Sequence, residues 1–389
     1  MDDAAKFGEP DASGLPPLLP PGLRDLLPPD AETEAAAVEA AMATFARHGY
    51  QRVKPPLLEF EDGLLAGAGA GVADQTFRLM DPDTRRMMGL RADITPQVAR
   101  IAATRLGNAP RPLRLSYAGQ CLRVQGSQLA PDRQVAQAGI ELIGSDAPEA
   151  DAEVILVAAE ALGAAGVARF SFDLTLPALA PALLDAGGMA GGSRRALLHA
   201  LDRKDAAAVA THGGALAGQL TRLLLAAGPV GPALDALRRE RLPDAAEGLR
   251  EALVATVRAI QARAPGLRLT LDPLEFRGFP YHTGLCTTVF APRRHEELGR
   301  GGRYRCGGEP AVGFSLLPDA VLRAASPRAA VPRAYVPWGA DRDAAARLRE
   351  RGFATVAALA PGDAPAEARR LLCTHLLRDG EAVALEPES

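Results

Sequence analysis

Side chains that could bind both ends of an amino acid occur in separated segments of this chain. Asp93, Thr95 and Gln137 offer a carboxylate, a hydroxyl and an amide oxygen, and such acceptors suit an ammonium group. Arg123 and Arg277 each offer a planar fork of donors that fits a carboxylate. These residue types together would suit a small zwitterion.

Each of these residues also has an ordinary structural explanation. Asp93 could be an acid that favours a helix N-terminus. Arg277, which precedes Gly278, could belong to a surface turn, and Tyr281 could be a core tyrosine. The Gly301-Gly302 pair is a weak signal for a phosphate loop. Only the joint occurrence of these features favours a binding pocket.

Four segments in a shared order resemble the class II aminoacyl-tRNA synthetases, and among them the histidyl-tRNA synthetase family. The matching stretches are Leu90-Arg-Ala-Asp93-Ile-Thr95-Pro-Gln-Val-Ala-Arg100, Gln137-Ala-Gly-Ile-Glu141, Leu274-Glu-Phe-Arg277-Gly-Phe-Pro-Tyr281-His-Thr-Gly284 and Gly301-Gly-Arg-Tyr304. The resemblance covers about residues 20 to 325.

The resemblance implies a histidine pocket. It assigns the pocket to Asp93, Thr95, Arg123, Gln137, Glu141, Arg277, Tyr281 and His282. Imidazole has two ring nitrogens, so the Glu141 carboxylate and the Tyr281 hydroxyl suit it. Gln137 and Glu141 are four residues apart, so in a strand they point to one face. His282 stands where the family has a second tyrosine.

The chain departs from the family where ATP is bound. The second class II signature normally reads Phe-Arg-x-Glu; its arginine is present as Arg123, but its glutamate is Gln125. In the third signature the arginine that meets adenine and triphosphate is Ala320, and the preceding glutamate is Asp319. Losing a fixed cation removes charge-assisted bonds to the triphosphate. We therefore expect no adenylation and no catalytic residues.

A histidine pocket without adenylation residues resembles the synthetase-like regulatory subunits of ATP phosphoribosyltransferase. That resemblance implies a role in histidine biosynthesis as part of a hetero-oligomer. The chain would bind L-histidine, activate a short catalytic subunit and transmit feedback inhibition, without a cofactor. Three alternatives stay open: an active histidyl-tRNA synthetase, an enzyme that joins an amino acid to another acceptor, and a histidine-binding module without this partner.

Composition argues against nucleic acid and membrane partners. The 389 residues include 44 Lys+Arg and 47 Asp+Glu, for a net charge of −3, which does not suggest a phosphate-binding surface. Cys121, Cys286, Cys306 and Cys373 are far apart, so neither a zinc site nor a disulfide framework is indicated. No signal peptide and no long apolar run occurs. A cytoplasmic protein is therefore expected.

The N-terminal half predicts the elements that must position the pocket. Residues 1–19 are rich in Pro and Gly and predict a flexible arm, and a helix is expected over Ala31–His48, ending before Gly49. The segment Tyr50–Glu59 predicts a strand that ends in a proline-bounded turn. This helix and strand resemble the first class II signature, which implies a homodimer interface. Short alternating runs between 86 and 144 predict antiparallel strands, with helices at about 93–106 and 149–164.

The remaining segments complete an α+β fold. Apolar residues at helical spacing predict a helical insertion over about 176–264 within a synthetase-like domain of residues 20–330. Residues 331–389 alternate strand and helix patterns and predict a small C-terminal α/β domain of β-α-β-α-β type. The expected class is therefore a class II synthetase-like antiparallel sheet flanked by helices.

Overall fold

The structure is a computed structural model that describes residues 18–126, 131–276, 282–292, 296–326 and 329–386. The chain divides into two compact units, Met1–Ser326 and Pro327–Ser389. Each unit has its own sheet and its own core.

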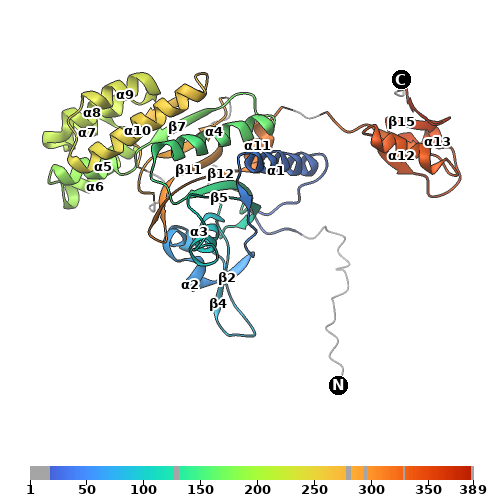
Figure 1. Cartoon of the computed structure of the whole chain (residues 1–389), viewed down its shortest axis with the longest axis horizontal. Coiled ribbons are helices and arrows are strands. Elements are labelled where there is room, and N and C mark those ends of the chain that lie inside the picture. The colour runs from blue at the N-terminus through green and yellow to red at the C-terminus, as the bar shows by residue number, and fades with distance from the viewer. Residues whose placement is uncertain (1–17, 127–130, 277–281, 293–295, 327–328, 387–389) are drawn as a thin grey trace. The chain divides into compact units, whose positions relative to one another are not determined.

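A nine-stranded sheet forms the centre of the first unit within the described residues (Figure 1). Neighbouring strands are antiparallel except for the parallel pairs β1–β5 and β7–β9. The predicted α+β class with a mainly antiparallel sheet is confirmed. In spatial order the strands are β1 (Gln51–Arg52), β5 (Leu113–Leu122), β6 (Gln134–Ile143), β12 (Glu309–Leu316), β11 (Glu297–Cys306), β10 (Cys286–Phe290), β7 (Ser171–Thr175), β9 (Leu269–Asp272) and β8 (Gly228–Pro229).

Helices cover both faces of this sheet (Figure 1). On one face, α1 (Asp30–Arg47), α4 (Pro148–Ala164) and α11 (Pro318–Ala324) pack on strand residues such as Ile140 and Leu142. On the other face, α3 (Thr95–Thr104) packs on residues such as Leu115 and Ile143. Because strand side chains alternate between faces, Gln137 and Glu141 lie on the α3 side. Gly49 follows α1 with a φ of +79°, as the sequence predicted.

The predicted strand from Tyr50, which was expected to end in a proline-bounded turn, is confirmed at β1, but a second strand after the prolines was not predicted. Only β1 and β2 (Leu58–Phe60) are strands in that stretch, and Pro55 and Pro56 lie between them. Proline has no backbone N–H for a ladder hydrogen bond, so the chain leaves the large sheet there. β2 then joins β4 (Met87–Leu90) and β3 (Arg78–Met80) in a small antiparallel sheet. The short helices α2 (Glu61–Leu64) and η1 (Gly67–Gln75) follow β2.

Between β7 and β9 the chain forms mostly helices, because apolar residues recur at helical spacing and one face of each long helix is buried. No helix among the described residues is both long and apolar enough to cross a membrane. The segment between β7 and β9 contains α5 (Leu179–Ala186), α6 (Gly191–Asp202), α7 (Ala206–His212), η2 (Gly214–Leu216), α8 (Ala217–Leu225), β8, α9 (Val230–Arg239) and α10 (Asp244–Arg263).

The second unit has a four-stranded sheet in the order β14-β13-β15-β16. The sequence predicted three strands, but a fourth, β16, pairs antiparallel with β15. Asp379 and Gly380 join these two strands with φ values of +50° and +83°. Asp-Gly is a recognised hairpin signal, so this strand could have been found. The elements are β13 (Arg333–Val336), α12 (Arg342–Glu350), β14 (Ala354–Ala357), α13 (Ala364–Arg370), β15 (His375–Arg378) and β16 (Glu381–Ala384).

Candidate amino-acid site

Glu141, near the end of β6, is the most buried carboxylate that the sequence assigned to the pocket, with 1% of its surface exposed. Its Oε1 accepts hydrogen bonds from Thr95 Oγ1 at 3.0 Å and Tyr117 OH at 3.3 Å. Its Oε2 accepts one from Tyr304 OH at 2.8 Å. Burial raises the pKa of Glu141 to about 8, although these hydroxyl donors act to lower it.

Two glycines leave room for this cluster. A Cβ atom at Gly313 of β12 would lie 1.8 Å from Glu141 Oε2. A Cβ atom at Gly139 of β6 would lie 2.5 Å from Tyr117 OH. Any other residue at either position would displace the carboxylate or the phenol. The glycines therefore let polar groups from separate strands meet inside the sheet layer.

Tyr117 and Tyr304 were missed as site residues by the sequence reasoning. Tyr117 OH is also 2.6 Å from Ser315 Oγ and 3.1 Å from Thr95 Oγ1. Burial raises the pKa of both phenols well above its ordinary value, so each stays a hydrogen-bond donor. Tyr304 ends the Gly-Gly-Arg-Tyr segment, which was a usable signal. Tyr117 can be identified as a neighbour of the site only once the pairing of β5 with β6 is known.

Asp93, Thr95 and Gln137 come together at the start of α3, and all three are buried. Asp93 Oδ1 accepts from Thr95 N at 3.1 Å, so Asp93 also serves the helix start. Gln137 Oε1 accepts from Ile94 N at 3.0 Å and from Cys121 Sγ at 3.2 Å. Gln137 therefore positions the backbone before α3. The second oxygen of Asp93, Oδ2, has no hydrogen-bond partner among the described residues.

Arg123 directly follows β5 and lies close to this group. Its backbone N–H donates to Arg133 O at 2.7 Å, while its Nε is buried without a hydrogen-bond partner in the described part of the chain. Burial raises the pKa of the Cys121 thiol; Asp93 raises it further, whereas Arg91 and Arg123 lower it. The thiol is thus within electrostatic range of Asp93 and both arginines. The Arg123 guanidinium can donate hydrogen bonds to a carboxylate.

Arg277 and Tyr281 lie outside the described residues. His282, which follows them, is half-buried. A Cβ atom at Gly302 of β11 would lie 2.7 Å from His282 Cδ2, so His282 packs on the strand that carries Tyr304. Of the eight residues assigned from the sequence, the structure places Asp93, Thr95, Arg123, Gln137 and Glu141 on or next to α3, β5 and β6, whereas His282 lies against Gly302 of β11.

The residues aligned with the family's nucleotide site offer little to a triphosphate. Ala320 is buried in α11. Asp319 accepts from Arg24 Nη2 at 3.3 Å and from Ala136 N at 3.2 Å, and Arg24 Nε is 3.6 Å from Asp132 Oδ1. Arg24 is therefore engaged by two carboxylates. The Asp319 carboxylate would repel phosphate. Among the described residues no group of three His, Cys, Asp or Glu side chains could hold a metal ion.

Sequence comparison defines the family. A histidyl-tRNA synthetase family model matches residues 22–321. An ATP phosphoribosyltransferase regulatory subunit from Gluconobacter oxydans is 55% identical over 94% of this chain and 96% of its own length. One from Rhodospirillum centenum is 54% identical over 93% and 95%. The chain belongs to the ATP phosphoribosyltransferase regulatory subunit family. This family membership confirms the resemblance drawn from the four sequence segments.

Solved structures share the family's synthetase-like fold. A structure from Bacillus halodurans, described as an ATP phosphoribosyltransferase regulatory subunit/histidyl-tRNA synthetase, has a TM-score of 0.77 at 22% identity and covers 93% of this chain and 97% of its own. A chain of the Thermotoga maritima ATP phosphoribosyl transferase (HisG:HisZ) complex has a TM-score of 0.58 at 18% identity, covering 75% of this chain and 98% of that one. At these identities the likeness concerns the fold.

Proposed function

We propose that this chain binds L-histidine at the Glu141 site and regulates a short catalytic ATP phosphoribosyltransferase without catalysing a reaction itself. The proposal rests on a difference between the amino-acid site and the nucleotide site of the same fold. Glu141, Asp93 and Arg123 keep the groups that suit an amino acid. Position 320, where the family's synthetases have an arginine, is a buried alanine.

The ligand's three polar groups have separate partners in this proposal. Asp93 Oδ2 accepts from the ammonium group, and the Arg123 guanidinium pairs with the carboxylate. Glu141 accepts from an imidazole N–H, and the Tyr304 and Thr95 hydroxyls hold its oxygens in place. Arg277, Tyr281 and His282 complete the proposed pocket on the strength of the family resemblance. A carboxylate that is shielded from bulk water strongly favours a ligand that donates a hydrogen bond to it.

Regulation follows if histidine has unequal affinity for the active and inhibited forms of an assembly. We assign the catalytic partner because relatives that are 55% and 54% identical are named ATP phosphoribosyltransferase regulatory subunits. The partner's full activity requires this subunit, and bound histidine reverses the activation. The chain itself dimerises through the segment Gly49–Glu59, where β1 lies at the end of the large sheet order.

A reconstitution experiment tests this function. The purified chain is mixed with a short catalytic phosphoribosyltransferase, and consumption of ATP and phosphoribosyl pyrophosphate is followed with and without L-histidine. We expect the rate to rise on mixing and histidine to reverse the rise. No activation at any ratio of the two proteins would refute the proposed regulatory role.

A further inference from the structure

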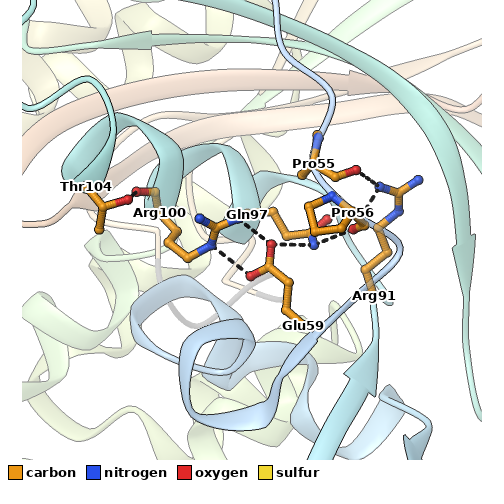
Figure 2. A network of polar contacts seen from close by, with 7 residues as sticks. All are labelled: Pro55, Pro56, Glu59, Arg91, Gln97, Arg100 and Thr104. Carbon is orange, nitrogen blue, oxygen red and sulfur yellow. Dashed lines mark hydrogen bonds and ion pairs between the residues drawn. The ribbon is translucent and has the colours of Figure 1, made fainter. Parts of the chain in front are cut away.

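Gln97, in the first turn of α3, is a buried amide with 1% of its surface exposed. Its Nε2 donates to Pro56 O at 2.8 Å and to Glu59 Oε1 at 2.9 Å (Figure 2). Because the amide nitrogen faces two acceptors, the opposite orientation of this amide would place oxygen against oxygen. Gln97 thus fastens α3 to the segment between β1 and β2.

Glu59 of β2 completes this attachment. Its carboxylate accepts from Arg100 Nε at 2.8 Å through Oε2, and Arg100 Nη2 pairs with Oε1 (Figure 2). The side chain of Glu59 is only 10% exposed. A forked arginine–carboxylate pair shielded from solvent fixes geometry as well as charge. One carboxylate therefore joins two side chains of α3, Gln97 and Arg100.

Arg91 ties the same segment to the strand that leads to Arg123. Its Nη1 donates to Pro55 O at 3.2 Å (Figure 2), and its Nε donates to Gln120 O of β5 at 2.8 Å. A Cβ atom at Gly119 would lie 2.5 Å from Arg91 Nη2, so the glycine allows this close approach. The Arg91 carbonyl accepts from Leu122 N at 3.0 Å.

The start of α3 is at the same time part of the amino-acid site. Asp93 and Thr95 lie at that start, and Ile94 N donates to Gln137 Oε1. With ten residues, α3 is about 15 Å long. Ile94 and Val98 are both 0% exposed, so the start of α3 is packed in the core. A displacement of the Pro55–Glu59 segment would therefore act on α3 through Gln97 and Arg100.

We infer that Gln97 and Glu59 are positioning residues, which hold Asp93 and Thr95 for the amino acid's ammonium group and couple that site to the open edge at Gln51–Arg52. Both residues of β1 are exposed, and β1 pairs with β5 on one side only within the described residues. We assign that edge to a second copy of this chain, because the segment Gly49–Glu59 resembles the signature that forms the dimer interface of class II synthetases. The inference rests on the proposed histidine binding and dimer.

Three variants test the inference in the full-length protein. Glu59→Gln removes the charge that Arg100 pairs with, and Gln97→Leu removes both amide donors at similar volume. Thr104→Val is the matched control, because Thr104 Oγ1 donates only to Arg100 O within α3 and does not contact the Pro55–Glu59 segment. L-histidine affinity is measured by calorimetry, and the dimer dissociation constant by sedimentation with and without histidine.

In the wild type we expect histidine to change the dimer dissociation constant by about fivefold or more, a usual size for coupled sites. Glu59→Gln and Gln97→Leu should bind histidine about tenfold more weakly and lose this dependence. Thr104→Val should match the wild type within about twofold. Folded variants with wild-type affinity and wild-type dependence would overturn the inference. A wild type that binds no histidine would refute the proposed function itself, and the inference with it.

Hydrogen exchange provides a readout that needs no ligand. The Ile94 and Thr95 amides donate to Gln137 and Asp93, so they report directly on the start of α3. They should exchange faster in Glu59→Gln and Gln97→Leu, while amides in α4 keep their protection. Equal exchange at Ile94 and Thr95 in all four proteins would show that the network does not position the site.

Discussion

Tyr304 reaches Glu141 across an entire intervening strand. Tyr304 belongs to β11 and Glu141 to β6, with β12 between them, yet the hydroxyl and Oε2 are 2.8 Å apart. The contact is possible because Gly313 of β12 lies directly opposite Glu141 and also opposite Gly302 of β11. Two successive positions in this row thus carry no side chain, and polar groups converge on Glu141 from both sides.

Replacement of Glu141 by glutamine should change how stability depends on pH. The native pKa of about 8 lies above the ordinary value of 4.5, so the folded protein holds a proton that the unfolded chain releases. This contribution is complete below pH 4.5 and is lost as the pH rises through 8. It amounts to roughly 5 kcal/mol at most. The free energy of unfolding can be measured with urea at about pH 5, 6.5 and 8, which lie within that window. It should depend less on pH in Glu141→Gln than in the wild type, and an unchanged dependence would contradict this assignment.

Truncation of Glu141 should also weaken histidine binding. Glu141→Ala removes a buried carboxyl group that pairs with the imidazole and leaves the ring N–H without a partner, which costs ~2 kcal/mol of binding free energy. Glu160→Ala is a suitable control, because Glu160 is an exposed carboxylate that contacts His48, the residue after α1. Calorimetric titration with L-histidine gives both constants. Equal affinity for the wild type and Glu141→Ala would mean that the imidazole is recognised elsewhere.

The purified chain should not exchange pyrophosphate into ATP when histidine is added. Ala320 and Gln125 leave adenine and triphosphate without their usual partners, and Asp319 adds a negative charge beside them. Restoring the arginine alone, in Ala320→Arg, should not create exchange, because position 320 is 3% exposed and packed in the core. Histidine-dependent exchange clearly above background would identify an active synthetase instead.

Activation and inhibition of the catalytic partner should separate by mutation. Glu141→Ala and Arg277→Ala should reduce inhibition by histidine and largely keep activation, since the pocket need not contact the activating surface. A coupling of about 1 to 3 kcal/mol between the two sites is typical. The measurement is the histidine concentration that halves the activated rate. Wild-type values in both variants would place the inhibitory histidine on the catalytic partner.

The sequence by itself determined the local elements and the chemical kind of the site. Periodicity placed α3 and α4 within a few residues of their observed bounds. The residue types at Asp93, Arg123 and Glu141 predicted an amino-acid ligand, and the resemblance to class II synthetases made Gln125 and Ala320 predict the absence of ATP chemistry. These properties depend on individual residues or short spacings, so no knowledge of distant contacts was needed.

Only the tertiary structure decided which groups meet at the site. Tyr117 and Tyr304 contact Glu141 because β5, β6, β12 and β11 are neighbours in this order. Strand order and register arise from pairing between distant segments, and a local pattern does not encode them. The use of Gln137 Oε1 by the Ile94 amide has the same origin.

The Pro55–Glu59 segment is a second case in which local sequence patterns did not predict distant contacts. The two prolines, which lack N–H groups for the ladder, end the first strand as the sequence predicted, but the second strand β2 was not predicted. The structure then brings Glu59 against Gln97 and Arg100, 38 and 41 residues away in the chain. A buried carboxylate needs such partners. Which partners it finds is set by how α3 packs on the sheet.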